Sequence, residues 1–122
     1  MCGFCTSKEI VNMKRDEGKI VGTKHDEGKN RLGLVLGSFA RALQEVGRVG
    51  TFGAKEYGDN NWIIVPDGER RYYDAMFRHD LAQASGEELD SKSGMYHAAH
   101  KAWNALACLD LMLRRKEQEG IK

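Results

Sequence analysis

Three polar side chains recur at helical spacing late in the chain, where an amphipathic helix would normally carry apolar residues. His97 and His100 are three positions apart and Asn104 follows four positions later, so all three share one stripe of a helix. Imidazoles one turn apart can hold a metal ion through their neutral ring nitrogens. They can equally be hydrogen-bonded interior histidines, and the spacing alone leaves both interpretations open.

Acidic side chains that could act with these histidines lie in earlier segments. Arginines flank both Glu45 and Asp74, and His79 lies shortly after the second of these acids. The polar loop that follows offers further oxygen ligands in Glu87 and Asp90. An ion held by carboxylates and imidazoles would bridge phosphate oxygens and assist the attack of water. In the alternative interpretation, the acids form structural ion pairs with the arginines.

A polar and aromatic cluster at positions 55–62 is a second candidate for ligand binding. Tyr57 and Trp62 could stack on a base while Asn61 hydrogen-bonds its edge, and Lys55 could contact phosphate. An ordinary loop, in which the rings fill the core and the asparagines stabilise turns, explains the same residues equally well. The glycines nearby match neither a Walker loop nor the dinucleotide-binding fingerprint.

Helices must position these groups. Apolar spacing predicts helices over about 38–50, 67–84 and 95–117, with Ser38 as the cap of the first. Positions 62–65 are one candidate for a short extended piece, and one such run makes no sheet. The sequence therefore predicts an all-α fold, a small helical bundle. The apolar residues expected to face its core include Leu43, Val46, Val49, Tyr72, Tyr73, Met76, Phe77, Leu81, Ala99, Trp103, Leu106, Leu109 and Leu113.

Length and composition restrict the class of protein. The 122 residues fit one domain, and 41% hydrophobic residues are enough for a core. A net charge of +1 argues against binding to a nucleic acid polymer. No apolar run approaches the ~20 residues that cross a membrane. The start lacks the apolar core of a signal peptide, so we expect a cytoplasmic protein.

The chain is expected to consist of a flexible N-terminal arm at 1–23 and a single helical domain at 24–118. Within the arm, Cys2 and Cys5 form a CxxC with no second pair elsewhere. Because a zinc ribbon needs four ligands, we interpret these thiols as reduced and without function in a loose terminus.

Several longer runs, in unbroken order, carry a resemblance to a known family. They are KHDEGKNRL (24–32), ALQEVGRVGTFGAKEYGDNNW (42–62), RYYDA (71–75) with Arg78 and His79, SGEELD (85–90) and SGMYHAAHKAWNAL (93–106). Together they resemble the phage and prophage dATP/dGTP diphosphohydrolase family, whose proposed kinship is with MazG-like and MazZ-like all-α nucleotide pyrophosphohydrolases. The resemblance covers about residues 24–113.

The resemblance implies conversion of dATP or dGTP to the monophosphate and pyrophosphate with a divalent metal ion. One departure is clear: the MazG hallmark has paired acids, ExxE and ExxD, on two helices. Here Arg48, three positions after Glu45, occupies the place of the second acid of an ExxE pair. His97 and His100 stand where paired acids would be expected. A mixed site of histidine and carboxylate ligands suits these residues better.

We therefore expect a dNTP diphosphohydrolase that uses Mg²⁺ or Mn²⁺, with Co²⁺ as a further candidate, and assembles as a homodimer or tetramer. The alternative is a non-catalytic protein of phage origin that sequesters nucleotides. The predicted metal ligands are Glu45, His79, His97 and His100, and the predicted catalytic residues are Glu45, Asp74 and His79. The predicted substrate-binding residues are Lys55, Tyr57, Asn61, Trp62, Arg71, Arg78 and Asn104.

Overall fold

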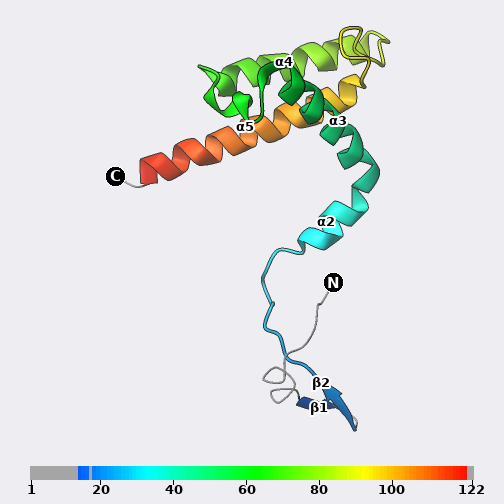
Figure 1. The fold of residues 1–122 in the computed structure, drawn as a ribbon, viewed down its shortest axis with the longest axis vertical. Helices are drawn as coiled ribbons and strands as arrows, with labels where there is room; N and C mark the ends of the chain where they lie inside the picture. Colours follow the sequence, from blue (N-terminus) through cyan, green and yellow to red (C-terminus); the bar gives the residue numbers. More distant parts are fainter. Residues whose placement is uncertain (1–13, 17, 121–122) are drawn as a thin grey trace. The chain divides into compact units, whose positions relative to one another are not determined.

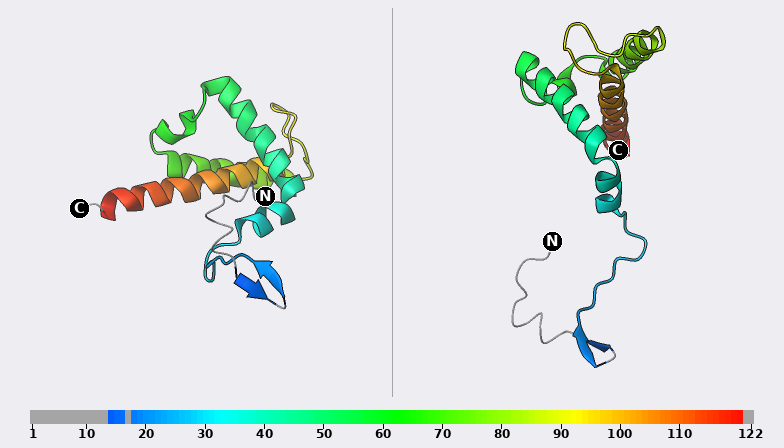
Figure 2. Two further views of the ribbon diagram at one scale, coloured as in Figure 1. Left: turned by 60° about the horizontal axis from the view of Figure 1, so that its bottom comes forward. Right: turned by 90° about the vertical axis from the view of Figure 1, so that its right-hand side faces the viewer.

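The computed structural model describes residues 14–16 and 18–120, and the chain divides into two units, Met1–Leu32 and Gly33–Lys122. Within the second unit, α4 and α5 lie side by side, and α3 packs against α5 (Figures 1 and 2). The predicted all-α bundle is confirmed for this unit. The helices are α2 (Leu32–Ser38), α3 (Ala40–Tyr57), the short 3₁₀ helix η1 (Asn61–Ile64), α4 (Gly68–Ala84) and α5 (His97–Gly120).

The first unit contains a short hairpin that the sequence did not indicate. Strand β1 (Lys14–Asp16) pairs with β2 (Lys19–Val21) in antiparallel register. Gly18 has a φ of +81°, which glycine adopts without the strain that a side chain would bring. The CxxC at Cys2 and Cys5 lies outside the described residues.

The helix boundaries agree with the sequence in part. The predicted helix at 67–84 corresponds closely to α4, whereas Ser38 ends α2 and does not cap α3. Phe39 precedes α3 and makes no side-chain cap. The expectation of an extended piece at 62–65 is wrong, because most of this run forms η1. Four residues with no neighbouring strand gain nothing from extended backbone, since strand preference depends on cross-strand packing.

The centre of the helical unit is a group of aromatic rings around Trp103 of α5. Trp62 of η1 and Tyr72 of α4 meet the Trp103 ring edge to face, at centroid separations of 6.0 and 5.5 Å. The Tyr72 hydroxyl donates a hydrogen bond to the Trp62 carbonyl (3.2 Å). Val49 of α3 and Ala107 of α5 are buried in this unit. Three helical elements are thereby fixed to α5 around one side chain.

The inner face of α5 differs from the predicted apolar stripe. Leu106, Leu109 and Leu113 are about half exposed, and so are Tyr73 and Phe77 of α4. The residues that face inward include His97, Ala99, Asn104 and Ala107. The predicted core positions at the three leucines and at Tyr73, Phe77 and Leu81 are therefore wrong. The reason is that α5 turns its small and polar residues, which allow close approach, toward α3 and α4.

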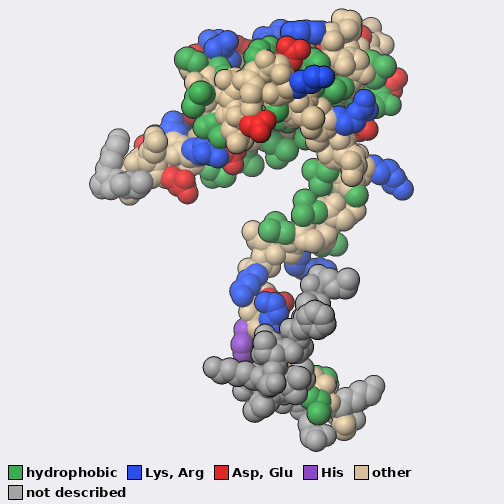
Figure 3. Space-filling view, in the orientation of Figure 1, with side chains coloured by type: hydrophobic (Ala, Val, Ile, Leu, Met, Phe, Trp, Pro, Cys, Tyr) green, Lys and Arg blue, Asp and Glu red, His purple; other side chains and the backbone are tan. Residues whose placement is uncertain are grey.

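Apolar side chains also remain exposed along α2 (Figure 3), among them Leu34, Val35 and Leu36. The predicted homo-oligomer stays a prediction.

Within the described residues, no helix is both long and apolar enough to span a membrane.

Two glycines of α3 provide a matched test of how this helix packs. A Cβ at Gly47 would meet nothing within 4 Å, whereas a Cβ at Gly50 would lie 3.2 Å from Nε1 of Trp103. Gly47→Ala should raise the free energy of unfolding by about 0.5–1 kcal/mol, because alanine favours helix. Gly50→Ala should gain less or lose stability, because the new methyl group crowds the indole. Urea unfolding of both variants measures this, and equal gains would contradict the contact between α3 and Trp103.

Candidate metal centre and adjoining cleft

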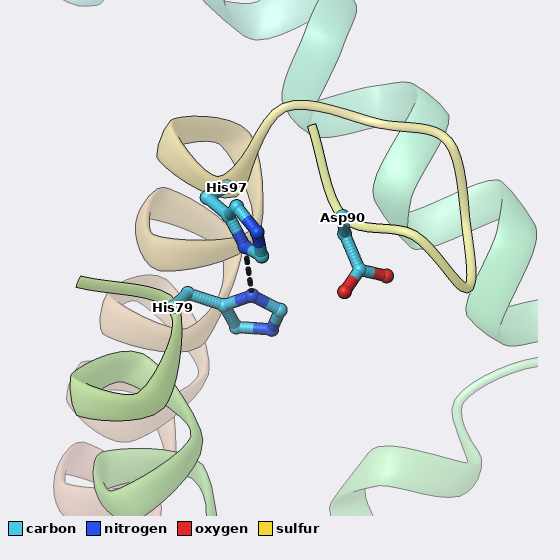
Figure 4. A group of neighbouring side chains, drawn as sticks. All are labelled: His79, Asp90 and His97. Carbon is cyan, nitrogen blue, oxygen red and sulfur yellow. Dashed lines mark hydrogen bonds between the residues drawn. The ribbon is translucent and has the colours of Figure 1, made fainter. Parts of the chain in front are cut away.

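A loop between α4 and α5 folds back to bring polar residues together at one end of the helix pair. The Asp90 amide donates a hydrogen bond to the Met95 carbonyl (2.7 Å), and the His97 amide donates one to the Glu88 carbonyl (3.0 Å). These bonds hold the loop against the first turn of α5. His79 near the end of α4, Asp90 in the loop and His97 at the start of α5 consequently face a common space (Figure 4).

The three histidines of this end form one group, defined here as the histidine group: His79, His97 and His100. The Nδ1 atoms of His79 and His97 are 2.8 Å apart. The rings of His79 and His100 stack nearly parallel, at 8° and a centroid separation of 4.4 Å. His97 is only 3% exposed. The structure thus brings the three histidines together, with His97 buried and His79 and His100 partly buried.

Two acidic residues and a serine surround the histidine group. Asp90 accepts a hydrogen bond from the Ser93 amide at Oδ2 (2.9 Å), and the Ser93 hydroxyl bonds to Nε2 of His100 (2.7 Å). Glu87 places a carboxylate oxygen 3.2 Å from Nε2 of His97. The angles at this short approach are poor for a hydrogen bond, and Nε2 of His97 has no other partner in the described part of the chain.

The protonation states of His79, His100 and Asp90 favour a cation. Burial, together with the neighbouring His100 and His97, lowers the pKa of His79 to about 4. Burial likewise lowers the pKa of His100. Burial alone would raise the pKa of Asp90, but hydrogen bonds from Ser93 outweigh it and the pKa is lowered. Neutral imidazoles beside an ionised carboxylate are the donors that divalent transition metals bind. One donor atom from each of His79, Asp90 and His97 lies within 4.8 Å of the others.

A cleft of about 920 Å³ opens beside the histidine group, between α3, η1, α4 and α5. Its volume is within the range that small-molecule ligands occupy. His100 lines this cleft and also stacks on His79, so the cleft and the histidine group share a residue. Six of the seven residues predicted to bind substrate line it: Tyr57, Asn61, Trp62, Arg71, Arg78 and Asn104.

The comparison with known proteins identifies the family. Residues 20–120 match the family model described as dATP/dGTP diphosphohydrolase, N-terminal. The chain belongs to the dATP/dGTP diphosphohydrolase family. A dATP/dGTP diphosphohydrolase of Salmonella phage PMBT28 is 36% identical over 83 residues, which are 68% of this chain. The chain spans only 27% of that relative's length. No solved structure matches this chain.

In this member of the dATP/dGTP diphosphohydrolase family, the residues on the cleft wall differ in their freedom to bind a ligand. Asn104 donates its amide to the His100 carbonyl (2.8 Å), which leaves its side-chain oxygen available as an acceptor. Trp62 packs on Trp103 as a core residue would, whereas Tyr57 is 65% exposed. Within residues 18–120, Arg71 and Arg78 form no ion pair with a carboxylate, so both charges are available to an anion.

Three predicted site residues of this family member lie elsewhere. Glu45 pairs with Arg48 (3.1 Å), and Asp74 pairs with Arg70 (3.1 Å). Neither acid lines the cleft or joins the group of possible metal ligands. Asp74 is on the exposed side of α4, and α3 meets α5 at Gly50, one turn or more beyond Glu45. Lys55 lines a separate groove along α3 with Arg48 and Met95.

The structure also brings in residues outside the final set of predicted ligands. From the sequence, Asp90 and Glu87 are possible oxygen ligands, but they are left out of that set because no spacing rule connects them to the histidines. Ser93 carried no signal at all, because its role arises only when the loop folds back on His100. Sequence periodicity locates helix faces and does not locate loop residues.

The low pKa of His79 predicts a pH dependence of stability in the metal-free protein. In the unfolded chain this histidine takes up a proton near its ordinary value of 6.5, whereas in the folded chain it resists protonation down to about 4. The part of the free energy of unfolding that is linked to His79 should therefore be fully present above pH 6.5 and be lost as the pH falls toward 4. Urea unfolding with a chelator at pH 7 and pH 5 measures this. His79→Gln should lose less stability between pH 7 and pH 5 than the unaltered chain. An equal loss in both proteins would contradict the assignment of the pH dependence to His79.

Proposed function

We propose that this chain hydrolyses purine deoxynucleoside triphosphates, dATP or dGTP, to the monophosphate and pyrophosphate with the help of a divalent metal ion. The observation that carries the proposal is that His100 belongs both to the histidine group and to the wall of the cleft. A nucleotide in the cleft would therefore have its phosphates next to residues that can hold an ion. The name of the phage relative supports the same reaction.

The reaction adds water to the α-phosphorus and breaks its bond to the oxygen that leads to the β-phosphate. Pyrophosphate leaves with that oxygen. A divalent ion, when bound, supplies a Lewis acid for the phosphate oxygens and lowers the pKa of a bound water. His79, His97 and Asp90 are the residues that would hold it, because their donor atoms converge. Glu45 and Asp74 have no role in the proposed reaction, because each pairs with a nearby arginine and neither is among the converging donors.

The cleft wall supplies binding for the rest of the nucleotide. Arg71 and Arg78 would neutralise phosphate charge, which guanidinium groups do through paired hydrogen bonds. Tyr57, exposed at the cleft, offers a ring on which a purine can stack. The side-chain oxygen of Asn104 would accept a hydrogen bond from base or sugar.

The direct test incubates the purified chain with each of the four dNTPs and Mn²⁺ or Mg²⁺. The products are then separated and identified. We expect dAMP or dGMP with pyrophosphate, and little turnover of the pyrimidine substrates. Release of single phosphates would contradict cleavage between the α- and β-phosphates. No turnover with any nucleotide and metal would exclude the enzyme.

One observation favours the alternative of a non-catalytic nucleotide binder. The segment that matches is only 27% of the phage relative, so the activity in that protein's name can belong to its remaining part. A binder predicts saturable binding of dATP or dGTP without product formation. Calorimetry on the same samples as the turnover assay therefore separates the two functions.

Arg78 provides a test of how the phosphates are held. Arg78→Ala should raise KM for the nucleotide about 10- to 100-fold, because a charge-assisted hydrogen bond contributes about 1.5–3 kcal/mol. Arg70→Ala is the matched control on the same helix, since Arg70 pairs with Asp67 and Asp74 and does not line the cleft. Steady-state kinetics of both variants measures the effect. An equal rise in KM for both would contradict phosphate binding by Arg78.

A further inference from the structure

The two imidazoles and one carboxylate beside the cleft favour a particular class of metal ion, and the proposed reaction alone does not require that class. We propose that His79, His97 and Asp90 form a resident site for one transition-metal ion of the class that prefers imidazole nitrogen, such as Zn²⁺ or Co²⁺, filled without nucleotide. The three residues come from α4, the loop and α5, and their donor atoms lie within 4.8 Å of one another. The ion's role rests on the proposed function, but its binding does not.

The two facing imidazole nitrogens are the first argument. Nδ1 of His79 and Nδ1 of His97 are 2.8 Å apart, so both cannot carry a proton. A tetrahedral ion with bonds of about 2.0–2.1 Å would hold two nitrogens about 3.3 Å apart. Small rotations of the two rings therefore suffice to admit an ion between them. In the metal-free chain one proton between the two nitrogens makes a hydrogen bond, and the ion would take the place of that proton.

The surroundings of His97 are the second argument. Its side chain is only 4% exposed, and its Nε2 has no hydrogen-bond partner of good geometry in the described part of the chain. The Glu87 carboxylate lies 3.2 Å from that Nε2, on the ring edge away from His79. A metal on Nδ1 places the proton on Nε2, 3.2 Å from this carboxylate, and a rotation of the half-exposed Glu87 side chain would complete the hydrogen bond. Such carboxylate–histidine–metal arrangements orient the ligand ring and raise its basicity.

The third argument is the way the loop holds Asp90. The Ser93 amide donates to Oδ2 of Asp90, and Oδ1 accepts no hydrogen bond from the described residues. One carboxylate oxygen is therefore fixed and the other is free to bind an ion. His100 bonds to Ser93 and stacks on His79, so it supports the ligand ring from the side of the cleft.

The composition of the site selects the class of ion. Mg²⁺ demands near-octahedral oxygen coordination and rarely binds imidazole, whereas Zn²⁺ and Co²⁺ accept nitrogen and carboxylate donors together. Two imidazoles with one carboxylate match the second class. A position would remain open on the ion for water or a phosphate oxygen.

The test is a titration of the full chain with Co²⁺ and with Zn²⁺ in the absence of nucleotide. It uses a Cys2→Ser/Cys5→Ser background, because a CxxC can also bind such ions. We expect one ion per chain, a visible Co²⁺ spectrum typical of low coordination number, and a raised Tm with Zn²⁺. A 100-fold excess of Mg²⁺ should not displace Co²⁺. Displacement by Mg²⁺, or no ion bound, would overturn the proposal.

Variants assign the ligands. His79→Gln should weaken Co²⁺ binding by about 100-fold and Asp90→Asn by at least about 10-fold, since losing even an outer-shell partner of a ligand costs about 10- to 100-fold. His25→Gln is the control, because His25 is exposed and lies outside the helical unit. Circular dichroism checks that each variant folds. If His79→Gln does not fold, Asp90→Asn still tests the site. Co²⁺ binding unchanged in both ligand variants would refute the site.

The outcomes separate this inference from the proposed function. If Co²⁺ binds as expected and no dNTP is hydrolysed, the metal site stands and the hydrolase fails. If dGTP is hydrolysed but the chain binds no Co²⁺, or Mg²⁺ displaces it, the hydrolase stands and the metal site fails.

Discussion

Replacing His97 by glutamine should reduce turnover of dATP or dGTP at least about 1000-fold. That factor corresponds to about 4 kcal/mol of transition-state stabilisation, which is what a bound metal ion typically contributes. His97 is the most deeply buried member of the histidine group, at 3% exposed, and it contacts both His79 and the Glu87 carboxylate. Its loss should therefore affect kcat far more than KM.

Single-turnover kinetics of His97→Gln, with excess Mn²⁺ or Zn²⁺, measures this effect. His25→Gln provides the matched control, because it removes an exposed histidine of the first unit. Thermal unfolding shows whether the variant is folded. A folded His97→Gln protein with undiminished kcat would exclude the histidine group from the reaction.

The largest effect on stability is expected at Trp103. Trp103→Ala should lower the free energy of unfolding by about 3 kcal/mol, the lower end of the usual cost of removing a large core ring, since Trp103 is partly buried. The loss is expected to be this large because Trp103 contacts Trp62 and Tyr72 and lies against Gly50. Three elements would lose their common contact on α5 together.

Leu106→Ala is the control for this prediction, since Leu106 lies one turn away on α5 and is 52% exposed. It should change stability by no more than about 0.5 kcal/mol, as surface substitutions usually do. Urea unfolding of both variants gives the comparison. Equal losses would show that the aromatic group is not the centre of the fold.

The sequence was most informative where a pattern is local. The helix at α4 was predicted to within a residue, because apolar spacing and the turn before Gly68 are properties of neighbouring positions. The stripe of His97, His100 and Asn104 was recognised for the same reason. Their placement in the interior follows once α5 is a helix whose small residues, Ala99 and Ala107, allow close approach on that side.

Local sequence patterns do not show how the helices are oriented relative to one another. The sequence does not show whether Asp74 lies on the inner or the outer face of α4. The packing of α4 against α5 shows that Asp74 is on the exposed face, where it pairs with Arg70. Leu106 and Leu109 have the apolar character of core residues, yet they are half exposed in the single chain. Apolar character permits burial and does not say which face is buried.

By itself, then, the sequence determined a helical chain, its family and the residue types able to bind phosphate and metal. The tertiary structure decided which of them meet. Residues far apart along the chain, such as His79 and His97, come within 2.8 Å only because the loop folds back and α5 packs along α4. The same packing kept Glu45 outside the group. Contacts between distant positions depend on how whole faces fit together, and no local spacing encodes that fit.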